Sequence, residues 1–169
     1  MIVVIALCVA LVLRLFVVQT FFIPSPSMSP TLKVGDRILV NKLAYRLHGV
    51  GRGDIIVFKA PPEVARACAT NDTDLVKRVI GLPGETISDK NGTVYIDGKV
   101  LKEPWLPKHD PNTFTPSFVP VKIPADNYFV LGDNRKVSCD SRYWGTVQRS
   151  LIIGKVDVRI WPLDRIAFF

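Results

Sequence analysis

The pattern of hydrophobic and polar positions changes abruptly after the first part of the chain. Residues Met1 to Leu13 carry no charge, and the apolar pattern continues past Arg14 to Ile23. A helix needs about 20 apolar residues to cross a bilayer core, and the long side chain of Arg14 can reach the lipid headgroups. A cleavable signal peptide would begin with a basic region, and a buried core helix would be unusual at so apolar a terminus. We therefore expect a membrane anchor helix over residues 1–20.

Beyond Leu32 the pattern has the period of strands. Short runs rich in Val and Ile, bounded by Gly or Pro, predict strands, and Asp97-Gly98 between two such runs predicts a hairpin. No segment after Leu32 has the pattern of a long amphipathic helix, so we expect a mainly β body. The predicted strands lie in residues 36–40, 54–59, 75–80, 93–101, 128–131 and 151–161.

The region between the hairpin and the later strands has a different composition. Residues 103–126 contain six prolines and little hydrophobic periodicity. We expect an irregular excursion there, outside the core. No internal repeat occurs, and 169 residues suggest roughly one domain of about 150 residues.

The net charge of +7 raises the question of an acidic partner. A nucleic-acid-binding surface would cluster its basic residues with aromatic ones or carry a recognisable module. Here the basic residues are scattered as pairs, such as Lys77-Arg78 and Arg135-Lys136, so we expect no nucleic-acid partner. Attraction to anionic lipid headgroups beside an anchor explains the charge better.

The usual nucleophile and metal motifs are missing. The two histidines, His48 and His109, lie in loop-like sequence, where an exposed surface histidine is the default, and no G-x-S-x-G or H-E-x-x-H pattern occurs. The three cysteines have no metal-binding spacing. Cys68 and Cys139 are free to pair in an oxidising compartment, and the sequence leaves that pairing open.

A serine can also be activated by a neutral lysine amine, which requires a lysine whose charge is disfavoured by burial. In LVKRVI, strand alternation places Lys77 on one face with Leu75 and Val79. Lys77 is therefore the candidate base. The alternative is an edge-strand lysine that discourages aggregation.

The stretch PSPSMSPTL, which follows the apolar segment, contains the candidate serines. Ser/Pro-rich stretches are usually extended linkers. Prolines also restrict the backbone around a reactive residue, so a rigid active-site segment is the second interpretation.

Four blocks in order carry a resemblance that decides between these interpretations. IPSPSMSPTL, GDRILVNKLAY, KRVIGLPGE and GDNRKVSCDSRYWG resemble the signature of bacterial type I signal peptidases (leader peptidases). That family has a mostly antiparallel β-sheet catalytic domain of signal-peptidase type. The resemblance implies such a domain over residues 21–169, with a variable insertion at 81–126, behind the anchor. Two positions depart from the family: Pro26 stands where a glycine is common, and Cys139 where a small residue is expected.

The resemblance also implies the roles of individual residues. Ser27 matches the nucleophile and Lys77 its general base, while Ser25 matches the hydroxyl that forms the oxyanion hole with the N–H of Ser27. Ser138 matches the position that hydrogen-bonds and orients the lysine. The charged residues that brace the site match Asp133, Arg78, Asp140 and Arg142. The positions that line the substrate pocket match Phe21, Ile23, Met28, Leu32 and Val76.

The expected function is that of a membrane-bound serine endopeptidase without metal or organic cofactor. It would cleave N-terminal signal peptides from exported preproteins, after small residues at the first and third positions before the cut. The catalytic domain would lie on the extracytoplasmic side of the cytoplasmic membrane, anchored by a single span in the lipid. Two alternatives differ from this function in a recognisable feature. A self-cleaving Ser/Lys repressor would carry a helix-turn-helix region in place of the apolar segment, and a membrane-tethered β module that binds exported chains would need no nucleophile.

Overall fold

The structure is a computed structural model that describes residues 17–108 and 110–169. Residues 1–16 of the anchor expected over residues 1–20 lie outside the described residues. His109 also lies outside them. The end of the expected helix is instead a strand, because residues 18–20 pair with the neighbouring strand of the main sheet. Among the described residues, no helix has the length and apolar character needed to cross a bilayer.

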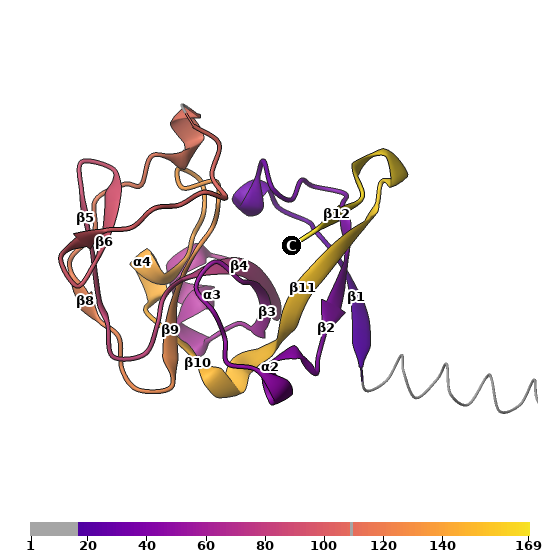
Figure 1. Ribbon diagram of the computed structural model, residues 1–169, viewed down its shortest axis with the longest axis horizontal. Helices are drawn as coiled ribbons and strands as arrows, with labels where there is room; N and C mark the ends of the chain where they lie inside the picture. The colour runs from indigo at the N-terminus through magenta and orange to yellow at the C-terminus, as the bar shows by residue number, and fades with distance from the viewer. Residues whose placement is uncertain (1–16, 109) are drawn as a thin grey trace, which may run out of the picture.

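The main sheet of the described residues has eight strands, and every neighbouring pair is antiparallel. Its order is β1-β2-β11-β3-β4-β9-β10, and β12 pairs with β11. Figure 1 shows it running from β1 on the right to β9 and β10 near the centre. The strands are β1 (Val18–Phe22), β2 (Arg37–Asn41), β3 (Ile55–Lys59), β4 (Asp74–Gly81), β9 (Asn127–Leu131), β10 (Val147–Gln148), β11 (Ile152–Trp161) and β12 (Ala167–Phe168).

A second sheet of four strands lies at the other end of the molecule, in the order β7-β6-β5-β8 (Figure 1). Its strands are β5 (Thr86–Lys90), β6 (Thr93–Ile96), β7 (Lys99–Val100) and β8 (Val121–Lys122). The predicted hairpin is confirmed: Asp97 and Gly98 join β6 to β7 with φ of 49° and 76°. Left-handed backbone at both central residues is what a two-residue hairpin turn requires.

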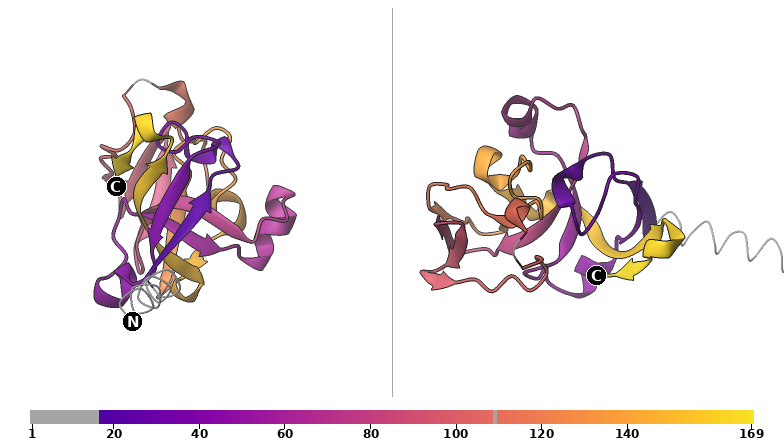
Figure 2. Two further views of the ribbon diagram at one scale, coloured as in Figure 1. Left: turned by 90° about the vertical axis from the view of Figure 1, so that its right-hand side faces the viewer. Right: turned by 90° about the horizontal axis from the view of Figure 1, so that it is seen from above.

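The helices of the described chain are short, as the sequence predicted. They are α2 (Ala44–Leu47), α3 (Pro62–Cys68), α4 (Ser141–Trp144) and the 3₁₀ turns η1 (Pro26–Met28), η2 (Pro111–Thr113), η3 (Arg149–Leu151) and η4 (Leu163–Arg165). Figure 2 shows α3 standing out from the body of the domain. Pro62 begins α3, where a missing N–H is tolerated, and Ala69 ends it in the left-handed conformation.

Alternating side chains of the central strands form separate cores. Ile56 and Phe58 of β3 belong to one cluster, whereas Ile55 and Val57 belong to another, as the two-residue period of a strand requires. A third cluster, including Ile87, joins the small sheet to β4 and β9.

The excursion expected at residues 103–126 is largely irregular, but it is not all outside the core. Thr115 and Ile123 are buried, and Ile123 packs in the cluster between the two sheets. The end of the excursion contributes β8, which pairs with β5 and so carries Ile123 inwards. Hydrophobic periodicity is too weak over two paired residues for the sequence to have predicted this strand.

Candidate active site

Ser27 lies in η1, the 3₁₀ turn that follows β1. Ser25 is the residue before the turn, with extended backbone, and Pro26 is its first residue, where a fixed φ favours the start of a helix. The turn closes with a hydrogen bond from Ser29 N to Pro26 O of 3.0 Å. Its last residue, Met28, is buried and anchors the segment in the core. The Ser/Pro stretch is therefore a fixed turn and not an extended linker.

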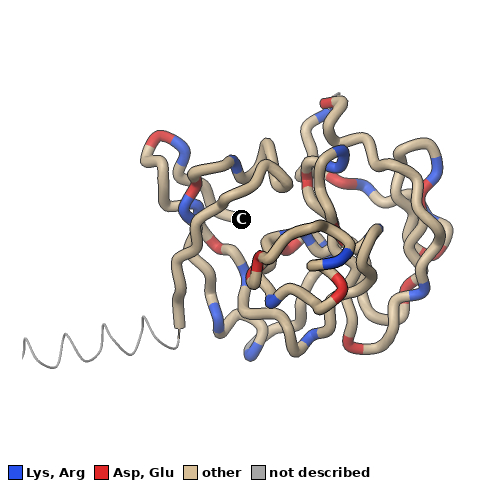
Figure 3. The backbone as a smooth tube through the Cα atoms, turned by 180° about the vertical axis from the view of Figure 1, so that it is seen from behind, with Lys and Arg blue, Asp and Glu red and all other residues tan. Residues whose placement is uncertain are grey.

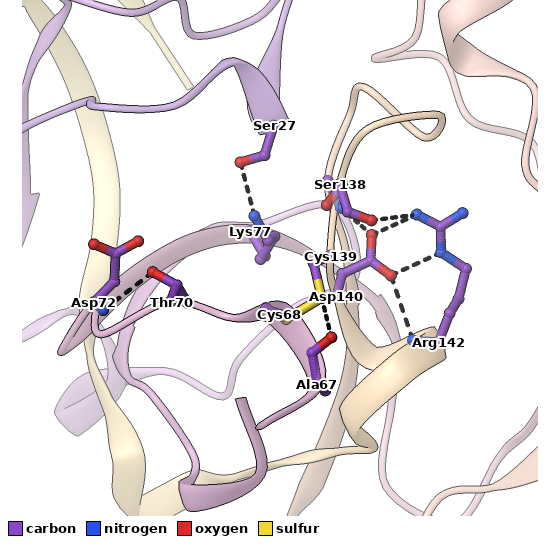
Figure 4. Close-up of a disulfide and its surroundings, with 11 residues drawn as sticks. Ser27, Ala67, Cys68, Thr70, Asp72, Lys77, Ser138, Cys139, Asp140 and Arg142 are labelled. Carbon is purple, nitrogen blue, oxygen red and sulfur yellow. Dashed lines mark hydrogen bonds and ion pairs between the residues drawn. A yellow bond between two sulfur atoms is a disulfide. The ribbon is translucent and has the colours of Figure 1, made fainter. Parts of the chain in front are cut away.

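Lys77 reaches Ser27 from the middle of the main sheet. Its strand, β4, lies between β3 and β9, so the edge-strand interpretation of this lysine is wrong. Nζ of Lys77 lies 2.7 Å from Oγ of Ser27, and Figure 4 shows the two side chains pointing at each other. Only 4% of Lys77 is exposed. Burial lowers its pKa to about 8, against the opposing effect of the Asp140 carboxylate, which raises it.

Ser25 brings a second hydroxyl to the same place. Its Oγ lies 3.2 Å from Oγ of Ser27, which in turn contacts Nζ of Lys77. The two serine hydroxyls therefore lie side by side near the lysine amine. Ser27 is the second residue of η1, and the first N–H groups of a helical turn have no partner within it. The hydroxyl of Ser25 and the N–H of Ser27 thus come from adjoining positions of one rigid turn.

Arg78 points away from Lys77 and forms a buried ion pair with Asp133. Nε and Nη2 of Arg78 donate to the two carboxylate oxygens at 2.8 and 2.6 Å, a bidentate geometry. The hydroxyl of Thr31, a residue just after η1, donates to the same carboxylate at 2.5 Å. This network ties β4, the turn after β9 and the serine segment together. Thr31 was not predicted, because its partner lies about a hundred residues away in the sequence.

Asp140 and Arg142 hold the end of the loop that follows β9 and begins with the turn at Gly132, Asp133 and Asn134. Nε of Arg142 donates to Oδ1 of Asp140 at 2.7 Å, and its Nη2 donates to the carbonyl of Ser138 at 3.0 Å. The other oxygen of Asp140 accepts from the N–H of Gly132 at 3.0 Å. The expected bracing residues therefore all hold the loop beside Ser27 and Lys77: Arg78 and Asp133 at its start, and Asp140 and Arg142 at its end.

The bond expected between Ser138 and Lys77 is not formed. Oγ of Ser138 is buried and has no hydrogen-bond partner among the described residues. It packs over Gly132, where an added Cβ would lie 2.2 Å from it, and the amine of Lys77 is directed at Ser27 instead. Ser138 lies beside the dyad in Figure 4 without the orienting contact.

Two further residues of the GDN turn touch the nucleophile's segment and were missed. Asn134 donates from its backbone N–H to the carbonyl of Ser27 at 3.1 Å and from its side chain to the carbonyl of Pro26 at 3.3 Å. A Cβ on Gly132 would lie 2.4 Å from the carbonyl of Ser27, so only glycine allows this approach. The quoted block GDNRKVSC contained both residues, but its spacing alone does not reveal contacts to η1.

Cys68 and Cys139 form a disulfide bond with a Cα–Cα separation of 5.8 Å. It joins the last residue of α3 to the position between Ser138 and Asp140, beside the dyad (Figure 4). The pairing that the sequence left open is thus present. The departure at Cys139 from the expected small residue is explained by its partner on α3.

Two hollows meet at the dyad. One, the apolar hollow, of about 120 Å³, is lined mainly by apolar residues, with Asp72 and Asp74 also in the lining. It includes four of the expected pocket residues, Phe21, Ile23, Met28 and Val76. The fifth, Leu32, is not in the lining. It is fully buried beside Met28 in the core, because the backbone turns inwards after η1.

The second hollow, of about 190 Å³, lies on the α3 side and is lined partly by the disulfide. It and the apolar hollow share Ser25, Ser27 and Lys77. An extended peptide crossing the dyad would therefore have room on both sides of the reacting bond.

Comparison with known proteins identifies relatives of this chain. A probable signal peptidase I-2 of Synechocystis sp. is 42% identical over 161 residues, which cover 95% of this chain and 71% of the relative. A signal peptidase I of Leptolyngbya laminosa is 44% identical over 93% of this chain and 75% of its own length. A signal peptidase I of Bacillus caldolyticus is 42% identical over 97% of this chain and 91% of its own length.

The fold has a counterpart among solved structures. The crystal structure of a signal peptidase I from Enterococcus faecalis V583 superposes with a TM-score of 0.51 and 34% sequence identity, covering 64% of this chain and 97% of that one. Residues 1–161 match the family described as signal peptidase, peptidase S26. With the relatives above and the serine and lysine in contact, the chain belongs to the signal peptidase family, peptidase S26.

Proposed function

We propose that this protein removes signal peptides from exported preproteins, with Ser27 as the nucleophile and Lys77 as its general base. The observation that carries the proposal is the 2.7 Å separation of Nζ and Oγ at a lysine whose pKa burial lowers to about 8. A minority of such an amine is neutral near physiological pH, far more than for an unperturbed lysine, and a neutral amine can accept a proton.

The first half of the reaction forms an acyl-enzyme. Oγ of Ser27 attacks the scissile carbonyl as its proton passes to Nζ of Lys77. The tetrahedral intermediate carries a negative oxygen, for which the N–H of Ser27 and the hydroxyl of Ser25 are the donors. Lys77 then gives its proton to the departing amine of the mature protein, and the carbonyl re-forms as an ester on Ser27.

The second half regenerates the enzyme. Lys77, neutral again, takes a proton from a water molecule, which attacks the ester carbonyl. The same oxyanion donors stabilise the second tetrahedral intermediate, and Ser27 leaves as an alcohol that takes the proton back from Lys77. No group beyond these side chains and water is required for the atoms to balance.

The apolar hollow next to Ser27 accounts for the expected preference for small residues before the cut. Its volume of about 120 Å³ and its lining by Ile23, Met28 and Val76 suit side chains such as that of alanine. A large side chain would meet the buried Met28, and overfilling a packed site is unfavourable.

We infer a location at the extracytoplasmic face of the cytoplasmic membrane, with the apolar residues that precede β1 as a single-pass anchor in the lipid. The uncharged run from Met1 to Leu13 supports the anchor. The disulfide of Cys68 and Cys139 supports the side, because disulfides persist in oxidising compartments outside the cytoplasm.

The test is cleavage of one model preprotein by the wild-type protein and by Ser27→Ala, with Ser150→Ala as a matched control at an exposed serine. We expect cleavage by the wild type and the control and none by Ser27→Ala. A serine-reactive β-lactam should form an adduct that depends on Ser27. Cleavage that survives Ser27→Ala would contradict the proposal, and the absence of both cleavage and adduct would favour the non-catalytic module.

A further inference from the structure

A cavity distant from the dyad has a basic lining. It has a volume of about 240 Å³ and is lined by Lys42, Tyr45, Arg46, Arg149, Ile152 and Ile153. Lys42 follows β2 and Arg46 lies in α2, while Arg149 comes from η3. Three cationic side chains from three elements thus border one hollow, and the sites described above use none of them.

Arg149 is held in a fixed orientation beside this cavity. Its Nη2 donates to the carbonyl of Tyr45 at 2.6 Å, and its guanidinium lies 5.5 Å from the centre of the Tyr45 ring. The hydroxyl of Tyr45 in turn donates to Asp54 at 3.0 Å. A guanidinium has five N–H donors, and among the described contacts only Nη2 is engaged. The remaining donors of Arg149 are therefore held in place for an acceptor.

The nearby carboxylates do not border the cavity. Asp54 and Asp157 are the acids that act on Tyr45. Asp54 forms an ion pair with Lys155 at 3.0 Å, and Asp157 accepts a hydrogen bond from Asn41 at 3.1 Å. Arg46 is exposed, and no hydrogen bond or ion pair of its side chain occurs within the described part of the chain. The lining is thus positively charged.

The cavity also lies next to the point where the apolar segment ends. The N–H of Lys42 donates to the carbonyl of Val17 at 2.8 Å, so the basic lining begins one hydrogen bond from the first described residue. Figure 3 shows Lys and Arg segments along the lower edge of the domain, on the side where the chain enters β1. The residues before Val17 are almost all apolar.

We propose that this cavity binds the phosphate of an anionic phospholipid headgroup, with Arg46 and Arg149 as the principal ligands. Guanidinium groups bind phosphate oxygens in a bidentate manner, and basic residues next to a membrane segment attract anionic lipids. The position beside Val17 selects a membrane lipid over a free anion as the occupant. The site is separate from the proposed peptidase chemistry.

The test uses the full chain in bilayer discs that contain equal parts of phosphatidylglycerol and phosphatidylcholine. After transfer to detergent, mass spectrometry gives the ratio of the two lipids retained by the protein. We expect phosphatidylglycerol to be enriched on the wild type. Arg46→Gln should lower the enrichment about fivefold, the factor for one basic residue at an anionic surface, and Arg149→Gln should lower it as well.

Lys99→Gln is the matched control, because Lys99 is an exposed lysine on the small sheet and its removal changes the net charge equally. It should retain the wild-type enrichment. Equal enrichment in Arg46→Gln, Lys99→Gln and the wild type would overturn the proposal. Since the exposed side chain of Arg46 makes no hydrogen bond or ion pair among the described residues, its replacement should leave the fold intact even if Arg149→Gln does not.

Inorganic phosphate distinguishes the two sources of the ligand. It is added to the discs at increasing concentration, with sodium chloride of the same ionic strength as the reference. We expect the enrichment of phosphatidylglycerol to be the same in phosphate as in sodium chloride. Loss of enrichment in phosphate alone would assign the cavity to a free anion and overturn the lipid assignment. Peptidase activity enters neither measurement, so failure of the proposed function does not affect the outcome.

Discussion

Two adjacent basic residues of β4, Lys77 and Arg78, are both buried, but they have different partners and different roles. Lys77 is 4% exposed and Arg78 is 5% exposed, so depth does not distinguish them. Arg78 meets the carboxylate of Asp133 in a bidentate pair. Lys77 meets the hydroxyl of Ser27, and burial lowers its pKa to about 8. Among the described contacts the amine of Lys77 has a hydroxyl and no carboxylate as its partner, so burial lowers its pKa. A guanidinium keeps its proton in proteins, so only the lysine of this pair can act as a base.

The comparison also shows how one strand serves both purposes. Side chains at successive positions of a strand point to opposite faces, so the base and the ion pair lie on opposite sides of β4, and the Asp133 carboxylate acts on Lys77 only through its charge, which raises the pKa of the lysine. On one face Lys77 reaches the serine turn, and on the other Arg78 fixes the turn after β9 through Asp133. That turn then carries Asn134 to the carbonyl of Ser27. Both faces of β4 thus position the same nucleophile.

The largest effect should come from removing the base. Lys77→Met keeps an unbranched apolar stem, and we expect kcat to fall by about 10⁴–10⁶, the range for losing one member of such a catalytic unit. Thermal stability should not fall, because the substitution removes a buried amine whose charge is unfavourable there. Lys59→Met on the neighbouring strand, where the lysine is exposed and paired with Asp74, should keep full activity. Full activity of Lys77→Met would end the Ser/Lys assignment.

On the other face, breaking the ion pair should act on stability first. Asp133→Asn leaves Arg78 buried without a counterion, and we expect the free energy of unfolding to fall by about 3–5 kcal/mol. Urea denaturation measures this directly. Replacing both partners, as in Arg78→Met with Asp133→Leu, should recover much of the loss, since an apolar pair leaves no uncompensated charge. If Asp133→Asn unfolds like the wild type, the pair does not hold this face together.

Loss of the second hydroxyl should have a smaller effect, confined to the transition state. Ser25→Ala should lower kcat by about 10²–10³, the usual result of removing one oxyanion donor, with little change in KM. Ser25→Thr keeps a hydroxyl and should retain much of the activity. Steady-state kinetics on one peptide substrate separates these variants. Should Ser25→Ala stay within about threefold of the wild type, Ser25 has no part in the oxyanion hole.

The smallest predicted effect concerns the charge around Lys77. Activity requires the neutral amine, so kcat/KM should rise with pH along a limb near the pKa of about 8. The exposed carboxylate of Asp72 raises that pKa. Asp72→Asn should therefore move the limb to slightly lower pH, and high salt should reduce the difference because it screens exposed charges. A limb that moves to higher pH would contradict this account.

Local patterns predicted most of the strands and singled out Lys77 as a candidate base. The strands around Ile56 and Val76 were readable because their runs of β-branched residues are bounded by Gly, Pro or polar turns. Lys77 was found through the apolar neighbours that alternate with it along one strand, and Ser27 through the resemblance of its block to a family signature. In both cases the signal lies within a few residues of the sequence.

What the sequence did not reveal depends on contacts between distant segments. Thr31 and Asn134 were missed because their partners lie about a hundred residues away. Leu32 was expected in the substrate pocket, but the backbone after η1 turns it into the core. Ser138 was expected to hold Lys77, but packing over Gly132 directs its hydroxyl elsewhere. No local pattern encodes these orientations.

The disulfide divides the chain into a covalent ring and two arms. The bond between Cys68 and Cys139, 71 residues apart, encloses Lys77 in the ring and leaves Ser27 on the N-terminal arm. A single proteolytic cut in the exposed part of residues 103–126 would open the ring without releasing a fragment. The strand of Lys77 and the loop of Asp140 would stay linked through sulfur, and the nicked chain would separate into two pieces only under reducing conditions. The disulfide therefore keeps the two halves of the domain linked when the backbone is cut within this irregular stretch.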